Sequence, residues 1–133
     1  MSQENVEAVR RSVDGWNRGD VDAWLELAHP EIEWVSEVAQ RIEGSEKVYR
    51  GTDEMRRYWD EWHAVWDVAI AVEEVRDLGD TILALARIRT RGGVSGVDLE
   101  GPVAYVFEFE NGLARRARAY LDPERALGAV GLA

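Results

Sequence analysis

The chain has 133 residues, enough for one domain with a sizeable hydrophobic core but too few for two such domains. Apolar residues make up 46% and charged residues 32%, a balance typical of globular proteins rather than of disordered or fibrous chains. The 16 Lys and Arg residues and 26 Asp and Glu residues give a formal net charge of -10. Such an acidic chain repels phosphate backbones, so we expect no nucleic-acid partner.

Cysteine and long apolar runs are both missing from the sequence. Without cysteine the chain has no disulfide, no thiolate metal ligand and no cysteine nucleophile. No run approaches the roughly 18 consecutive apolar residues that a membrane crossing needs. The polar start of the chain, residues 1–11, does not resemble a signal peptide. We therefore expect residues 1–133 to form a single soluble, cytoplasmic domain with no membrane partner.

The first segment of the chain has apolar residues at helical spacing. Apolar residues recur at i, i+3, i+7 and i+10 on one helix face: Val6, Val9, Val13 and Trp16. Gly19 is expected to end this helix, and Asp20 to cap a short second helix. The apolar face of that second helix comprises Val21, Trp24, Leu25 and Leu27. Pro30 closes it and leaves His29 at its C-terminus, because the residue before a proline is disfavoured in the helical region.

The apolar period changes to two from Glu31 and predicts a first strand. The residues on one face of this strand are Ile32, Trp34 and Ser36. The polar stretch 39–47 is predicted as a loop, and Val48–Arg50 as a very short strand. Thr52 then caps a third helix. The apolar face of the third helix comprises Met55, Trp59, Trp62 and Trp66.

Four long strands are predicted for the rest of the chain. They span residues 67–77, 81–91, 97–110 and 113–121. The turns fall at 78–80, at Gly92-Gly93 and at Asn111-Gly112, the last a strong hairpin signal because both positions tolerate positive φ. Asp122 starts a short terminal helix. The order α-α-β-β-α-β-β-β-β, with this C-terminal helix, predicts an α+β fold with three helices on one face of the sheet.

Five segments carry a resemblance to a known family. They are VDGWNRGDVDAW (residues 13–24), HPEIEW (29–34), VYRGTDEMRRYW (48–59), FEFENG (107–112) and YLDPERAL (120–127). In this order and spacing the segments resemble the SnoaL-like domains of the nuclear transport factor 2-like and ketosteroid isomerase-like superfamily. The resemblance spans nearly the whole chain.

That resemblance implies a cone-shaped fold of the cystatin-like type. A curved, mostly antiparallel sheet wraps around the helices and leaves an apolar cavity open at one end. Many members bind a small hydrophobic molecule there, and many dimerise through the outer face of the sheet. The superfamily contains isomerases, cyclases, epoxide hydrolases, dehydratases and binding modules, so the fold leaves the chemistry open.

The catalytic pattern of the steroid isomerases in that superfamily is not retained. Their general base, a carboxylate near the end of the first strand, corresponds to Ser36. Their oxyanion-hole tyrosine and aspartate correspond to Ser12 and Tyr105. Serine is a poor general base unless another group activates it, so we expect no ketosteroid isomerisation. The neighbouring Glu37 is expected on the outer face, unless a bulge at the strand end turns it inward.

The candidate site residues are aromatic side chains, one imidazole and one hydroxyl. Tyr105 lies in the inward phase of its strand, as a pocket-lining or an ordinary core tyrosine. His63 is a candidate acid or base, and with Tyr105 and Ser36 it completes the catalytic set. The ligand-binding candidates, Trp34, Tyr58, Trp59 and Trp62, form either a pocket wall or simple core packing. Apart from His29 with Glu31 and Glu33, a set too loose for a zinc site, neither histidine has further ligands at metal-binding spacing, so we expect no metal, and no cofactor.

Arginine residues alternate on the predicted outer face of the sheet. They are Arg87, Arg89, Arg91, Arg116 and Arg118. Glu108 and Glu110 share the outward phase, so cross-strand ion pairs explain the pattern. The alternative is a homodimer interface on the outer sheet face, reached by the arginines and Tyr120. On the inner face, Ala117 and Ala119 have small side chains that would enlarge a cavity.

Two functional hypotheses follow. In the first, a homodimer binds a small hydrophobic molecule in the cone and carries out cofactor-independent acid–base chemistry of the isomerase, cyclase or hydrolase type. In the second, the chain is a non-catalytic ligand-binding or dimerisation module. An ionisable group inside the cone would favour catalysis, and a wall of apolar rings would favour a binding module.

Overall fold

Within residues 2–44, 47–92 and 99–132, the part of the chain that the computed structural model describes, a six-stranded sheet has the order β2-β1-β6-β5-β4-β3. The strands are β1 (Ala28–Ser36), β2 (Val48–Arg50), β3 (Trp66–Asp77), β4 (Thr81–Gly92), β5 (Leu99–Glu110) and β6 (Leu113–Tyr120). The helices are α1 (Ser2–Arg18), α2 (Val21–Leu25), α3 (Glu37–Glu43), α4 (Gly51–Val65) and α5 (Pro123–Ala129). None of the described helices has the length and apolar character that a bilayer crossing requires.

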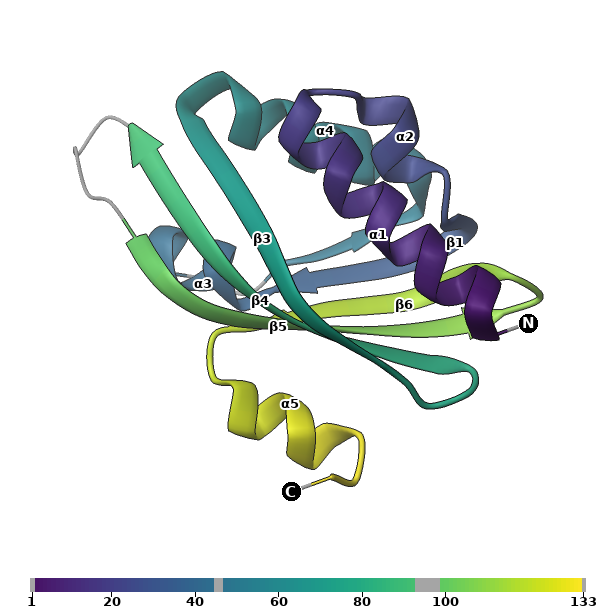
Figure 1. Cartoon of the computed structure of the whole chain (residues 1–133). Helices are drawn as coiled ribbons and strands as arrows, with labels where there is room; N and C mark the ends of the chain where they lie inside the picture. Colours follow the sequence, from purple (N-terminus) through teal and green to yellow (C-terminus); the bar gives the residue numbers. More distant parts are fainter. Residues whose placement is uncertain (1, 45–46, 93–98, 133) are drawn as a thin grey trace.

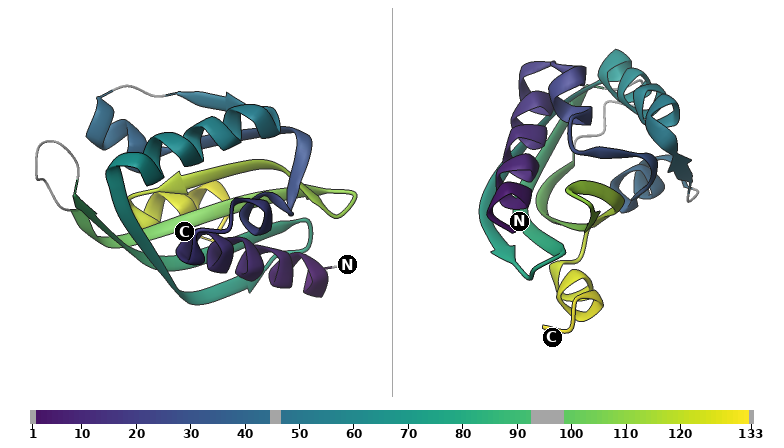
Figure 2. Two further views of the ribbon diagram at one scale, coloured as in Figure 1. Left: turned by 90° about the horizontal axis from the view of Figure 1, so that it is seen from above. Right: turned by 90° about the vertical axis from the view of Figure 1, so that its right-hand side faces the viewer.

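The sheet is strongly curved, and the long helices occupy its concave side. β1 runs parallel to β6, whereas every other neighbouring pair in this sheet is antiparallel. α1, α2 and α4 lie against the concave face, and α5 lies on the opposite face (Figures 1 and 2). This arrangement confirms the predicted α+β cone. The predicted turn at Gly92-Gly93 and the predicted strand start at Val97 fall on or beside residues 93–98, which lie outside the described residues.

The core forms where helix side chains meet the inward phase of the long strands. The inward residues of β4 and β5 are Ile82, Ala84, Ala86, Ile88, Val103, Tyr105, Phe107 and Phe109. They pack with Val9 and Trp16 of α1, Trp24 of α2, and Trp59 and Trp62 of α4 in one cluster. Alternation along the strands and helical spacing along α1 and α4 thus deliver apolar side chains to the same interior.

The segment predicted as a loop at 39–47 contains a helix, and that prediction was wrong. α3 runs Glu37–Glu43, directly after β1. The Oγ of Ser36 accepts a hydrogen bond from the N–H of Ala39 at 3.2 Å and caps the helix. Gly44 ends the helix with a φ of 83°, a conformation that glycine adopts without strain. The polar composition of the segment suggested a loop, although capping residues, Ser36 and Gly44, stand at the two ends of this short helix.

α2 ends earlier than predicted, because the chain joins the sheet before Pro30. The carbonyl of Leu27 accepts a hydrogen bond from the N–H of Ala114 in β6 at 2.7 Å. β1 therefore begins at Ala28, and His29 lies in this strand instead of at a helix C-terminus. The Nδ1 of His29 accepts a hydrogen bond from a backbone N–H two residues further along, at 2.9 Å.

The C-terminal part of α1 is hydrogen-bonded to β3, the strand at one edge of the sheet. Trp16 Nε1 donates to the carbonyl of Val68 at 3.1 Å. The Asn17 amide donates to the carbonyl of Ile70 at 2.7 Å and accepts from its N–H at 2.9 Å. These bonds satisfy edge backbone groups that would otherwise be open to another strand, and they hold α1 over the concave face.

Replacing Asn17 by Ala should destabilise the protein, because both hydrogen bonds to Ile70 are lost. We expect the free energy of unfolding to fall by about 1 to 2 kcal/mol, measured by urea denaturation followed through tryptophan fluorescence. Arg10→Ala, a change on the exposed face of the same helix, should stay within about 0.5 kcal/mol of the parent. Equal stability of the Asn17 and Arg10 variants would contradict a clamp at the sheet edge.

Candidate functional site

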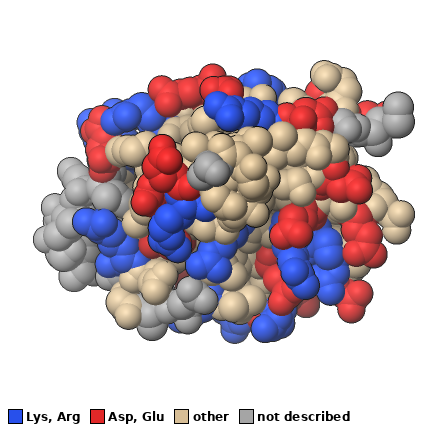
Figure 3. Space-filling view, turned by 90° about the horizontal axis from the view of Figure 1, so that it is seen from below, with Lys and Arg blue, Asp and Glu red and all other residues tan. Residues whose placement is uncertain are grey.

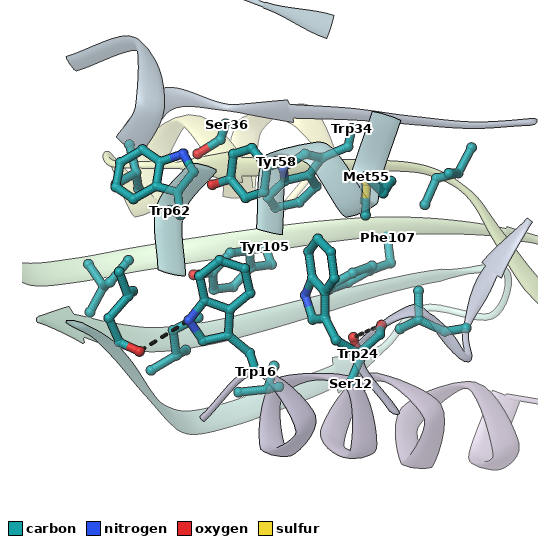
Figure 4. A pocket seen from close by; sticks show the side chains of 18 residues that line it. Ser12, Trp16, Trp24, Trp34, Ser36, Met55, Tyr58, Trp62, Tyr105 and Phe107 are labelled. Atoms are coloured by element: carbon teal, nitrogen blue, oxygen red, sulfur yellow. Dashed lines mark hydrogen bonds between the residues drawn. The ribbon is translucent and has the colours of Figure 1, made fainter. Parts of the chain in front are cut away.

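A cavity of about 50 Å³ lies between the helices and the concave face of the sheet (Figure 4). Its wall is largely aromatic: Trp16, Trp24, Trp34, Tyr58, Trp62, Tyr105 and Phe107. None of the 18 described residues that line it is Asp, Glu, His, Lys or Arg. The cavity therefore combines a small volume with an apolar wall that carries a few hydroxyl and indole N–H groups.

Regular secondary structure places each of these side chains. Trp34 and Ser36 are two residues apart on β1 and so point to the same face of the sheet. Met55, Tyr58 and Trp62 have the i, i+3, i+7 spacing that puts them on one side of α4. In the parallel register, Ala117 of β6 lies opposite Trp34, and its methyl group leaves space beside the indole.

Five of the seven residues proposed from the sequence line this cavity: Trp34, Ser36, Tyr58, Trp62 and Tyr105. Trp59 and His63 do not belong to the lining. The imidazole of His63 stacks on the Trp59 ring with a centroid distance of 3.8 Å, and its Nδ1 lies 3.1 Å from the Trp59 carbonyl oxygen. The Trp59 ring packs against Trp16 and Trp24 at 5.1 and 5.3 Å. These two side chains are part of the packing between the helices.

The two serines in the wall have structural hydrogen bonds. Ser12 donates to the carbonyl of Trp24 at 2.7 Å and ties α1 to α2. Ser36 accepts from the N–H of Ala39 as the cap of α3. Neither contacts a base within the described residues that would activate it as a nucleophile.

Some lining residues were absent from the sequence-based site. Trp16, Trp24 and Met55 were recognised only as apolar helix faces, although the spacing that buries them also turns them toward the cavity. The apolar faces of three amphipathic helices pack on one concave sheet, and this is the sequence feature that identifies these additional lining residues. A residue on the buried face of such a helix lines the interior wherever packing leaves space.

Tyr105 is the buried phenol of the site. Its side chain is 6% exposed, and its hydroxyl makes no hydrogen bond with any described residue. Burial, with a smaller contribution from Tyr58, raises the pKa of Tyr105 well above the usual 10.0. The phenol therefore stays neutral over the physiological range and can offer its O–H as a donor.

Glu37 is buried, which corrects the expected exposed position on the outer face. Its carboxylate accepts a hydrogen bond from the N–H of Leu121 at 2.9 Å. It also forms ion pairs with Arg125 at 2.5 Å and Arg118 at 3.6 Å. Because Glu37 begins α3 instead of extending β1, its side chain is engaged by the end of β6 and by α5, and it is not part of the cavity lining.

The model of the SnoaL-like domain family matches residues 9–117 of the chain. An NTF2-like protein of unknown function from Burkholderia pseudomallei has a TM-score of 0.79 and 22% identity, over 94% of this chain and 95% of that one. TerC, co-crystallised with polyporic acid, has a TM-score of 0.77 and 19% identity, over 96% and 98%. A candidate SnoaL-like polyketide cyclase from Jannaschia has a TM-score of 0.74 and 21% identity, over 98% and 94%. At these identities the likeness concerns the fold, and no curated protein matches the chain.

Replacing Tyr105 by Phe should make stability less sensitive to alkaline pH. In the unfolded chain a tyrosine ionises near 10.0, whereas burial keeps the pKa of folded Tyr105 higher. Between those two values the unfolded chain has lost a proton that the folded chain retains, so stability falls as pH rises. We expect the Tm of the parent to decline more steeply than that of Tyr105→Phe between about pH 9 and 11.

Tyr120→Phe, which changes a half-buried tyrosine outside the cavity lining, provides the matched control and should follow the parent. Parallel Tm curves for all three proteins would show that Tyr105 is not held neutral by the fold.

Proposed function

We propose that this chain, which belongs to the SnoaL-like domain family, binds a small, mostly apolar molecule in the cavity between its helices and its sheet. The observation that carries the proposal is the cavity wall, in which aromatic and aliphatic side chains from both layers surround one space. Such a wall suits an apolar guest that a few polar groups orient. TerC, with the same fold, was co-crystallised with polyporic acid, which supports a small-molecule role.

Binding without acid–base catalysis fits this wall best. General acids and bases work well when their pKa lies near the working pH. None of the 18 described lining residues carries a carboxylate or an imidazole, and burial raises the pKa of Tyr105. His63, the imidazole proposed from the sequence, packs on Trp59 outside the lining. We therefore favour the ligand-binding module over the isomerase, cyclase or hydrolase hypothesis.

The guest must displace side chains as it enters. About 50 Å³ accommodates a few water molecules, whereas pockets for drug-sized ligands have roughly 300–1,000 Å³. Met55 lies in the wall and is the most adaptable of its side chains, because an unbranched thioether has three rotatable bonds. A small guest with a compact apolar body therefore fits the site better than a long one.

Replacing Ala117 by Met should block binding, because the longer side chain would extend from β6 into the cavity. We expect the affinity for toluene, followed by tryptophan fluorescence and by NMR, to fall at least about tenfold, or about 1.4 kcal/mol. Ala69→Met makes the same change at an exposed position of β3 and should bind toluene like the parent. A natively stable Ala117 variant with undiminished toluene affinity would place the guest elsewhere.

We also propose that two copies associate through the outer face of the sheet. A groove on this face, between α5 and the strands, has an apolar floor: Val35, Val48, Leu78, Val106, Tyr120 and Val130. Acidic and basic side chains line it together: Glu33, Glu108, Arg116 and Arg118. Figure 3 shows uncharged surface between groups of both signs on this side of the molecule. A two-fold interface must complement itself, and a mixed-charge border around apolar residues supports that.

Replacing Val48 by Asp should shift the protein toward monomer, because this exposed valine, 38% accessible, would bring a charge into the apolar floor. Val65→Asp, at a valine that is 46% exposed at the end of α4, should leave association unchanged. Light scattering coupled to size-exclusion chromatography at micromolar concentration measures both. A parent protein that elutes as a monomer would contradict the dimer.

A further inference from the structure

Two buried N–H groups in the cavity wall have no acceptor within the described part of the chain. They are the indole nitrogens of Trp34 in β1 and Trp62 in α4, whose residues are 6% and 3% exposed. An indole nitrogen donates a hydrogen bond and cannot accept one, and leaving such a donor buried without a partner is unfavourable. Trp16 lines the same cavity, but its Nε1 donates to the carbonyl of Val68. Among the described residues, the fold therefore supplies an acceptor to the Trp16 indole but not to the buried indole nitrogens of Trp34 and Trp62.

The unpartnered donors belong to one connected group of rings. The rings of Trp34 and Trp62 contact Tyr58 from different sides of the site, with centroid distances of 5.7 and 5.9 Å. Trp34 also stacks on Tyr105 at 6.3 Å, and the Tyr105 hydroxyl likewise has no hydrogen-bond partner among the described residues. Figure 4 shows the Trp62 nitrogen on the side of its ring that faces Ser36. Residues of β1, α4 and β5 thus bring donor groups to the wall of one cavity.

The same wall offers little to a guest that donates hydrogen bonds or carries charge. None of the described lining residues has a carboxylate, and Ser36 already accepts a hydrogen bond from the N–H of Ala39. Within the described part of the wall, no residue has a cationic side chain that would balance an anion. The rise in the pKa of Tyr105 shows that burial here disfavours a negative charge. A neutral guest with acceptor atoms complements these groups.

We infer that the ligand is a neutral molecule whose polar atoms accept hydrogen bonds, such as a ketone oxygen, and that the indole N–H groups of Trp62 and Trp34 bind this oxygen. The inference rests on the proposed function and specifies its ligand. The Tyr105 hydroxyl provides a further donor in the same wall. The hydrocarbon part of the guest packs against the rings, and no covalent bond forms or breaks.

The test compares cyclohexanone with methylenecyclohexane, which has the same ring and carries C=CH₂ in place of C=O. In ¹H–¹⁵N spectra of the intact protein, the indole N–H resonances of Trp62 and Trp34 should move downfield with the ketone and not with the alkene. Trp62→Phe and Trp34→Phe identify these resonances, because each variant lacks one. Each variant should also lower the ratio of ketone affinity to alkene affinity by about threefold to tenfold, the range expected for one lost hydrogen bond.

Trp59→Phe is the matched control, because it removes a buried indole that lies outside the lining and should leave the ratio unchanged. The outcomes separate the two proposals. If neither probe binds, the proposed function fails. If both probes bind, but the ketone moves neither indole resonance and the ratio is the same in the parent and in both variants, the acceptor-bearing ligand is refuted while the apolar binding site stands.

Discussion

The structure depends on large helix side chains packing against small residues of the concave sheet face. Trp16, Trp24 and Tyr58 project from α1, α2 and α4, whereas the opposing strands present many alanines: Ala84, Ala86, Ala114, Ala117 and Ala119. Small residues let the sheet curve closely around the rings, and burial of the rings removes a large apolar area from water. The same difference in size leaves the cavity, because flat rigid rings do not fill a curved surface completely.

Some of the residues that hold the helix layer in place also line the cavity. Trp16 lines the cavity and donates to Val68 at the sheet edge, and Ser12 lines it while joining α1 to α2. The scaffold and the cavity wall therefore share Trp16 and Ser12. A guest that enters must replace contacts between the lining side chains, which favours a compact ligand. Met55 can move to make room, because its side chain is flexible.

Glu37 follows a cavity-lining residue in the chain, but its carboxylate binds partners outside the cavity lining. Glu37, one residue beyond Ser36, is held by Arg125, Arg118 and the N–H of Leu121. A buried carboxylate is tolerated where such partners satisfy it. With Glu37 held outside, the 18 described lining residues include no charged side chain, and two of their indole N–H groups have no acceptor among the described residues. This polarity matches recognition of an acceptor atom better than it matches proton transfer.

The sequence by itself determined which faces of the helices and strands are buried, because the periods of 3.6 and 2 are local properties of the backbone. It therefore predicted the inward direction of Tyr105 and the aromatic face of α4, whereas the cone was implied by the resemblance to the SnoaL-like domains. It could not separate Trp62, which lines the cavity, from Trp59, which packs between helices. Nor did it predict that Ser36 caps α3, or that Val68 partners one indole while two others have no acceptor among the described residues. The Ser36 cap is a local contact that the polar composition obscured, whereas the partners of the indoles depend on contacts between segments far apart in the chain, which only the tertiary structure decides.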